Sequence, residues 1–141
     1  MITRKADARW TGELKTGSGH LRLGSGAFEG KYSFTTRFEG TPGANPEELL
    51  GAAHAGCYSM ALNNAMFLAG HAPKSVFTTA EVKLDKTDAG TSIVAIHLTT
   101  EAEVPGMTAE QFLEFAESAK QNCIISRALS VPMTLTATLK S

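Results

Sequence analysis

The clearest pattern in the chain is the alternation of apolar and polar residues over two neighbouring segments. In residues 76–85 one face would carry a mostly apolar set, namely Val76, Thr78, Ala80, Val82 and Leu84. Residues 92–104 repeat the alternation, and Asp88-Ala89-Gly90 between them has the composition of a tight turn. Because a period of two residues is typical of a half-buried strand, we predict an antiparallel hairpin here. A similar alternation with threonines predicts a last strand at residues 132–139.

Residues 6–38 alternate less regularly and are broken by glycines. The cluster Thr16-Gly17-Ser18-Gly19 predicts a turn between two short strands. Residues 31–38 predict a stronger strand, with Phe34 and Phe38 on one face and Arg37 on the other. We therefore expect a three-stranded antiparallel meander that ends close to Arg37.

Residues 45–69 depart from this alternation and predict one long helix. Asn45 suits the N-cap, Pro46 suits the first helical position, and Glu47 and Glu48 favour the positive end of the helix dipole. No breaker follows until Gly70. Since the segment has few polar residues beyond its first turn, we expect most of this helix to be buried in the centre of the molecule.

Residues 108–122 predict a second helix, because Thr108 and Gln111 have the spacing of a capping box. The predicted order of elements is βββαββαβ, with antiparallel strands packed around the long buried helix. The chain contains no recognisable linker, repeat or low-complexity segment. We therefore expect residues 1–141 to form a single α+β domain.

The composition excludes several classes of function. The 141 residues carry a net charge of −1, which provides no basic surface for nucleic acid and no polybasic patch for membranes. The first residues lack the apolar run of a signal peptide, and no apolar run reaches the length of a membrane span. We expect a cytoplasmic protein with neither nucleic acid nor membrane as a partner.

The two cysteines, Cys57 and Cys123, fall on core-facing positions of the predicted helices. One interpretation is that both simply fill the core, since free cysteine packs as a small hydrophobe. Another is a redox pair, which could form a disulfide if the two Cα atoms lie within about 7 Å. A weaker third interpretation is a zinc site, because His54 lies one helical turn from Cys57 but structural zinc usually takes four ligands.

Arg37 and Glu47 are the charged residues nearest to the cysteine helix in the sequence. A guanidinium favours the reactive thiolate and can donate hydrogen bonds to a peroxide, while a carboxylate can hold the guanidinium in place. The alternative is a solvated arginine and a glutamate that serves only the helix dipole. Glu47 precedes Cys57 by ten residues, about 15 Å of helix, so one chain does not easily combine them. If all three form one site, Glu47, and Arg37 with it, should come from the second chain of a two-fold dimer.

Taken together, these motifs resemble the OsmC (osmotically inducible protein C) family, the relatives of organic hydroperoxide resistance proteins. The matching segments extend over nearly the whole chain and are residues 35–40, 45–49, 52–57, 84–90 and 122–126. The place of Arg37, shortly before Asn45-Pro46-Glu47-Glu48, resembles the OsmC branch more than its cousins. In relatives a proline commonly follows the second cysteine, whereas Ile124 follows it here.

The resemblance implies a peroxiredoxin-like hydroperoxide reductase that acts in oxidative or osmotic stress defence as an intertwined homodimer without a cofactor. By this analogy Cys57 is the peroxidatic nucleophile, Cys123 the resolving thiol, Arg37 the activator and Glu47 its orienting partner. A dithiol, for which the family suggests dihydrolipoyl groups, would reduce the resulting disulfide. Phe34, Phe38, Met60 and Phe67 are candidates for an apolar pocket that accepts organic peroxides, although simple core packing is the favoured interpretation for any single one of them. The alternative function is a dimeric binding or sensing module with inert cysteines.

Overall fold

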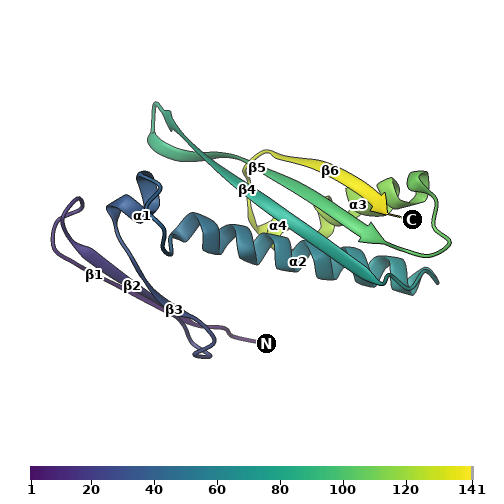
Figure 1. Cartoon of the computed structure of the whole chain (residues 1–141), viewed down its shortest axis with the longest axis horizontal. Helices are drawn as coiled ribbons and strands as arrows, with labels where there is room; N and C mark the ends of the chain where they lie inside the picture. The colour runs from purple at the N-terminus through teal and green to yellow at the C-terminus, as the bar shows by residue number, and fades with distance from the viewer. Residues whose placement is uncertain (141) are drawn as a thin grey trace. The chain divides into compact units, whose positions relative to one another are not determined.

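The computed structural model describes residues 1–140, which fall into two compact units, Met1–Leu49 and the residues from Leu50 onward. Figure 1 shows the elements of both. The first unit contains the antiparallel sheet β1-β2-β3, made of β1 (Ala6–Thr11), β2 (Ser18–Leu23) and β3 (Glu29–Tyr32). The predicted meander is therefore confirmed.

The predicted strand at residues 31–38 is wrong in its second half, which is the short helix α1 (Phe34–Phe38). The cause is a capping box that sequence reading missed: the Thr36 N–H donates to Ser33 Oγ at 3.2 Å, and the Ser33 N–H donates to Thr36 Oγ1 at 2.9 Å. Phe34 and Phe38 still share a face because residues four apart also meet on a helix, and their ring centroids are 5.1 Å apart. Arg37 consequently lies in the last turn of a helix.

The second unit contains the sheet β4-β5-β6, made of β4 (Ser75–Thr87), β5 (Gly90–Glu103) and β6 (Met133–Lys140). The β4–β5 hairpin confirms the antiparallel prediction. The strand β6 contradicts it, because β6 pairs with β5 in parallel, from Ile96 opposite Met133 onward. The reason is the connection: α3 (Ala109–Asn122) and α4 (Ile124–Ala128) bring the chain back to the other end of the sheet, as parallel strands require.

The long helix α2 (Pro46–Leu68) confirms the strongest helical prediction, and α3 confirms the second. The start of α2 belongs to the first unit, and from Leu50 the helix packs within the second. Its buried face follows helical spacing through His54, Tyr58, Leu62 and Met66. Gly51 lets this face approach the sheet closely, because a Cβ at that position would lie 3.3 Å from the Ala80 carbonyl oxygen.

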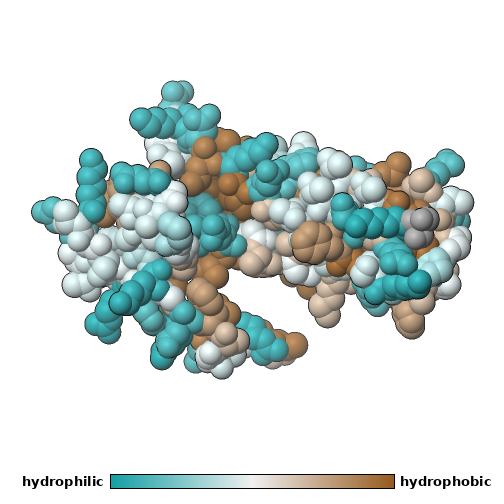
Figure 2. Space-filling view, viewed as in Figure 1, coloured by the Kyte–Doolittle hydropathy of each residue, from teal (hydrophilic) through white to brown (hydrophobic). Residues whose placement is uncertain are grey.

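The opposite face of α2 is exposed in the single chain, so the prediction of a mostly buried helix holds for one face only. Met60 is 78% exposed, Phe67 60% and Leu68 76%. Apolar side chains of this kind are visible at the surface in Figure 2. An exposed face of large apolar residues on a long helix is typical of a contact surface.

The core of the second unit lies between α2, α3 and the sheet. Its fully buried side chains include Tyr58 and Leu62 from α2, Ile96 and Leu98 from β5, and Phe112 from α3. The Tyr58 hydroxyl donates to the Ala116 carbonyl at 2.9 Å, which satisfies the polar end of a buried ring. No helix in the described part of the chain has the length and apolar character needed to cross a bilayer.

Candidate active site

Arg37 and Glu47 form a two-pronged ion pair within the first unit. The Arg37 Nε lies 3.0 Å and 3.2 Å from the two carboxylate oxygens of Glu47, and Nη2 lies 2.7 Å from Oε1. The Glu47 side chain is only 10% exposed, whereas that of Arg37 is 38% exposed. Among the described residues, the Nη1 of Arg37 has no hydrogen-bond partner. The carboxylate thus fixes one edge of the guanidinium and leaves the other edge available.

Local capping holds this pair in place. Asn45 caps α2, as the sequence predicts, since its Oδ1 accepts the Glu48 N–H at 2.8 Å. Its Nδ2 donates to the Thr36 carbonyl at 3.3 Å, and the Thr36 hydroxyl donates to the Ala44 carbonyl at 2.9 Å. These bonds tie α1 to the first turn of α2, which fixes the backbone on both sides of the ion pair.

An aromatic pocket of about 180 Å³ adjoins Arg37 in the first unit. Its lining consists of Trp10, Leu14, Tyr32, Ser33, Phe34, Arg37 and Phe38. The guanidinium carbon of Arg37 lies 5.1 Å from the centroid of the Phe38 ring. Phe34 and Phe38 therefore line a pocket as predicted, while Met60 and Phe67 are not among its residues and point outward from α2.

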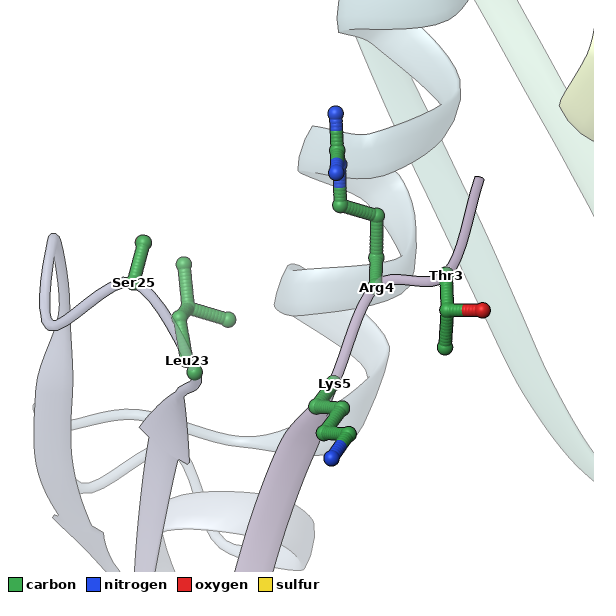
Figure 3. Close-up of a pocket in the computed structure, with 6 residues that line it drawn as sticks. Thr3, Arg4, Lys5, Leu23 and Ser25 are labelled. Carbon is green, nitrogen blue, oxygen red and sulfur yellow. The ribbon is translucent and has the colours of Figure 1, made fainter. Parts of the chain in front are cut away.

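A second hollow of the first unit, shown in Figure 3, contains no predicted site residue. Thr3, Arg4, Lys5, Leu23, Gly24 and Ser25 line it. The Lys5 carbonyl is already satisfied by the Gly24 N–H at 2.8 Å. Its charged groups, Arg4 and Lys5, are exposed, and we assign this hollow no role.

Cys57 and Cys123 are brought together in the core of the second unit. Cys57 is partly buried on α2, and Cys123, only 1% exposed, ends α3 and caps α4. Both are free thiols, and Cys57 packs against the core cluster that contains Cys123. The structure therefore pairs the two cysteines in space, although 66 positions separate them in the sequence.

Several hydrogen-bond donors surround the Cys123 sulfur. Burial is the largest influence and by itself raises the pKa of the Cys123 thiol. Hydrogen bonds from the Ser126 hydroxyl and N–H, both at 3.3 Å, from the Cys57 thiol and from the Ile125 N–H act the other way. Together these donors bring the pKa of Cys123 below its ordinary value.

His54 is fully buried behind this group. Its Nε2 lies 2.7 Å from Ser126 Oγ, and its Nδ1 has no hydrogen-bond partner among the described residues. Burial lowers the pKa of His54, which keeps the ring neutral. Sequence reasoning placed His54 only in a zinc alternative and gave Ser126 no role. The available signal was a cysteine followed three residues later by serine, a spacing that allows a helix cap.

The described residues provide no ligand set for the zinc alternative. They contain no group of three or more histidine, cysteine, aspartate or glutamate side chains that could hold a metal ion. The nitrogen of His54 that makes a contact faces Ser126.

An α+β fold with two neighbouring free thiols is the arrangement of a redox protein that acts through cysteines. Comparison with known proteins identifies its family. The family model described as OsmC-like protein matches residues 38–137, and the chain belongs to this family. The chain is 47% identical to peroxiredoxin OsmC of Escherichia coli K12 over 141 residues, which is 99% of each chain.

Solved structures show the same fold. An organic hydroperoxide resistance protein from Elizabethkingia anophelis is 26% identical, with a TM-score of 0.72 over 100% of this chain and 97% of that one. The organic hydroperoxide resistance protein OhrB of Bacillus subtilis is 23% identical, with a TM-score of 0.71 over 99% and 98% of the two chains. The predicted family and the α+β fold class are thus confirmed.

Proposed function

We propose that this chain is a thiol-dependent peroxidase that reduces organic hydroperoxides to alcohols. The observation that carries the proposal is that the free thiols of Cys57 and Cys123 share one core cluster in a chain 47% identical to a peroxiredoxin. The chemistry needs no cofactor, because sulfur alone takes up the oxygen and the electrons come from thiols. Residues 1–141 act as one domain in this proposal, since the relatives match nearly the full chain.

The first step is attack of the Cys57 thiolate on one peroxide oxygen. The O–O bond breaks, an S–O bond forms, and the alcohol leaves after taking up a proton, so that Cys57 becomes a sulfenic acid. Cys123 then attacks the sulfenic sulfur, which forms the disulfide and releases water. A dithiol, for which we infer a dihydrolipoyl-type group, reduces the disulfide by exchange.

Arg37 is assigned the role of activator and Glu47 that of its orienting partner. The free edge of the Arg37 guanidinium suits a peroxide oxygen or a thiolate, both of which accept hydrogen bonds. Glu47 is engaged with Arg37 in its own chain, and ten residues of α2, about 15 Å, separate it from Cys57. We therefore infer that the Arg37–Glu47 pair of one chain serves Cys57 of a second chain.

The dimer that this arrangement needs has a candidate surface on α2. Its exposed face combines large apolar side chains with small residues such as Ala52, Ala53 and Gly56. A Cβ at Gly56 would meet nothing within 4 Å, so the space above it is open in the single chain. We propose an intertwined homodimer in which this face of α2 contacts its symmetry mate.

The aromatic pocket beside Arg37 favours an organic substrate. Its walls are ring faces and the aliphatic side chain of Leu14, which would bind the carbon part of an organic hydroperoxide while Arg37 binds its oxygens. A role in oxidative stress defence follows from this substrate, and the resemblance to the OsmC family extends the proposal to osmotic stress. We place the protein in the cytoplasm, because a reducing compartment keeps both thiols free and supplies dithiols.

The test is consumption of cumene hydroperoxide by the pre-reduced protein with a dithiol reductant. Cys57→Ser should abolish consumption, whereas Lys86→Ser, at an exposed position near the β4–β5 turn, should leave it unchanged. Cys123→Ser should react for one turnover and then stop through overoxidation of Cys57. If Cys57→Ser consumes peroxide as fast as the unmodified protein, the cysteines are inert and the alternative of a binding or sensing module stands.

A further inference from the structure

A row of three buried polar side chains runs from His54 through Ser126 to Cys123. The proposed cycle uses Cys123 but gives His54 and Ser126 no function. The Nε2 of His54 lies 2.7 Å from Ser126 Oγ, which lies 3.3 Å from Cys123 Sγ. His54 comes from α2, while Cys123 caps α4, on which Ser126 lies. Three polar side chains thus meet inside the core, where each needs its hydrogen bonds.

The direction of the hydrogen bonds in this row follows from the other nitrogen of His54. The Nδ1 atom is buried without a partner, and a buried donor left unsatisfied costs free energy. The proton of the neutral ring therefore belongs on Nε2, where Ser126 Oγ accepts it. Ser126 has a single hydroxyl hydrogen, and with its oxygen accepting from His54 this hydrogen is directed to the Cys123 sulfur.

This direction gives Cys123 a set of donors and no acceptor. The Ser126 hydroxyl and N–H both donate to its sulfur at 3.3 Å, and no hydrogen bond of the described residues gives a Cys123 proton an acceptor. A thiol that keeps its proton accepts few such bonds, whereas a thiolate uses all of them. The buried geometry is therefore the one that a sulfur anion requires.

We propose that His54 and Ser126 are positioning residues that hold Cys123 as a thiolate ready to attack the sulfenic acid on Cys57. The inference rests on the proposed function, because it assigns the second step of that cycle. In this step the S–S bond forms and the S–O bond of the sulfenic acid breaks. The Cys57 sulfur is reduced as the Cys123 sulfur is oxidised, and the departing hydroxide takes a proton from solvent to become water.

The other titratable groups near Cys123 do not supply the charge balance. Burial, with the negative charges of Glu117 and Cys123, raises the pKa of Tyr58, so its hydroxyl stays neutral. Glu117 on α3 pairs with Lys120 at 3.1 Å near the surface. The hydrogen-bond donors, led by Ser126, are thus the groups that stabilise the Cys123 thiolate.

The first measurement follows the thiolate absorbance of Cys123 against pH in a Cys57→Ser background, which leaves one titrating thiol and requires no peroxidase activity. Ser126→Ala should lower the thiolate fraction at neutral pH about tenfold, as the loss of one hydrogen bond to a charged group implies, and Ser126→Thr should restore it. His54→Leu should act in the same direction, whereas His54→Gln, which keeps a donor, should not. Thr100→Val is the matched control, because Thr100 carries a fully buried hydroxyl that lies 3.0 Å from the Thr78 hydroxyl and makes no hydrogen bond to Cys123 among the described residues.

The second measurement is a single turnover of the two-cysteine protein with one equivalent of cumene hydroperoxide. Samples quenched with a sulfenic-acid trap and a thiol alkylator are then weighed by mass spectrometry. Ser126→Ala should leave peroxide consumption unchanged and slow disulfide formation about tenfold. A merely structural role would slow both steps together.

Three outcomes are decisive. If Ser126→Ala titrates like its parent, the proposal is overturned. If His54→Gln behaves like His54→Leu, the assigned hydrogen-bond direction is wrong. If the titration shifts as expected but the unmodified protein consumes no peroxide, the thiolate network stands and it is the proposed peroxidase function that fails.

Discussion

A mixed dimer can decide whether Arg37 acts within its own chain or on a second one. One chain carries Cys57→Ser and keeps Arg37, and the other carries Arg37→Ala and keeps Cys57. Each parent homodimer lacks one required group at both sites. In the mixed dimer, an arginine that acts across the interface restores one complete site, whereas an arginine that acts within its own chain restores none.

The activity expected of the mixed dimer follows from the geometry of α2 and from the number of complete sites. Ten residues at 1.5 Å each place Cys57 about 15 Å along the helix from Glu47, which holds the Arg37 guanidinium at 2.7 Å. An arginine side chain spans only about half of that distance, so we expect action across the interface. The mixed dimer should then show half of the activity per dimer of the unmodified protein.

The assay uses two affinity tags on co-expressed chains, purification over both, and peroxide consumption per dimer. Controls are the two parent homodimers and a mixed dimer of two unmodified chains with the same tags. Activity no higher than that of the parents would refute the reasoning, since it would place Arg37 and Cys57 of one chain in one site. Failure of the unmodified tagged chains to associate would refute the dimer itself.

Further predictions concern stability and substrate choice. Ile124→Pro should be neutral or stabilising by up to about 1 kcal/mol in thermal unfolding, because Ile124 is the exposed first residue of α4. Arg127→Pro should cost about 3 kcal/mol, because it removes the hydrogen bond from the Arg127 N–H to the Cys123 carbonyl at 3.0 Å. A loss at Ile124 as large as that at Arg127 would contradict this. Phe34→Ala should lower kcat/KM about tenfold for cumene hydroperoxide, which corresponds to the loss of about 1.4 kcal/mol of apolar contact, and should not lower it for hydrogen peroxide. An equal loss for both peroxides would show that the aromatic pocket does not bind the substrate. Because burial lowers the pKa of His54, the unfolded state binds more protons at this residue, and the free energy of unfolding should fall as pH drops below about 6.5. His54→Gln should reduce this fall when the free energy of unfolding in urea is measured against pH. The same pH dependence in both proteins would contradict a buried, neutral His54.

The sequence could predict elements whose signals act locally. The long hairpin follows from strict alternation, and α2 and α3 follow from Asn45 and Thr108 at their starts. Each of these signals depends on residues within one or two turns of each other. Such short-range patterns survive in the folded chain because burial and capping reinforce them.

Predictions failed where a short pattern fits two structures. Phe34 and Phe38 share a face on a strand and on a helix alike, and only the capping bonds between Ser33 and Thr36 decide for α1. The parallel pairing of β6 depends on the path of α3 and α4. The alternation within β6 shows that it is a strand but does not indicate its direction. The hydrogen bond between His54 and Ser126 joins residues 72 positions apart, and a pattern within one element cannot predict such a contact.

On the proposed function, the different burial of the two cysteines fixes the order of their reactions. Cys57 is partly exposed on α2, so a peroxide can reach its sulfur, while Cys123 is 1% exposed behind it. A low thiol pKa by itself would make Cys123 the easier sulfur to oxidise. Burial removes that risk, because a thiolate held in the core meets no peroxide and can react only with Cys57, which packs against the same cluster. The core thus protects the resolving sulfur from overoxidation while keeping it charged, and the sulfenic acid on Cys57 is the electrophile within its reach.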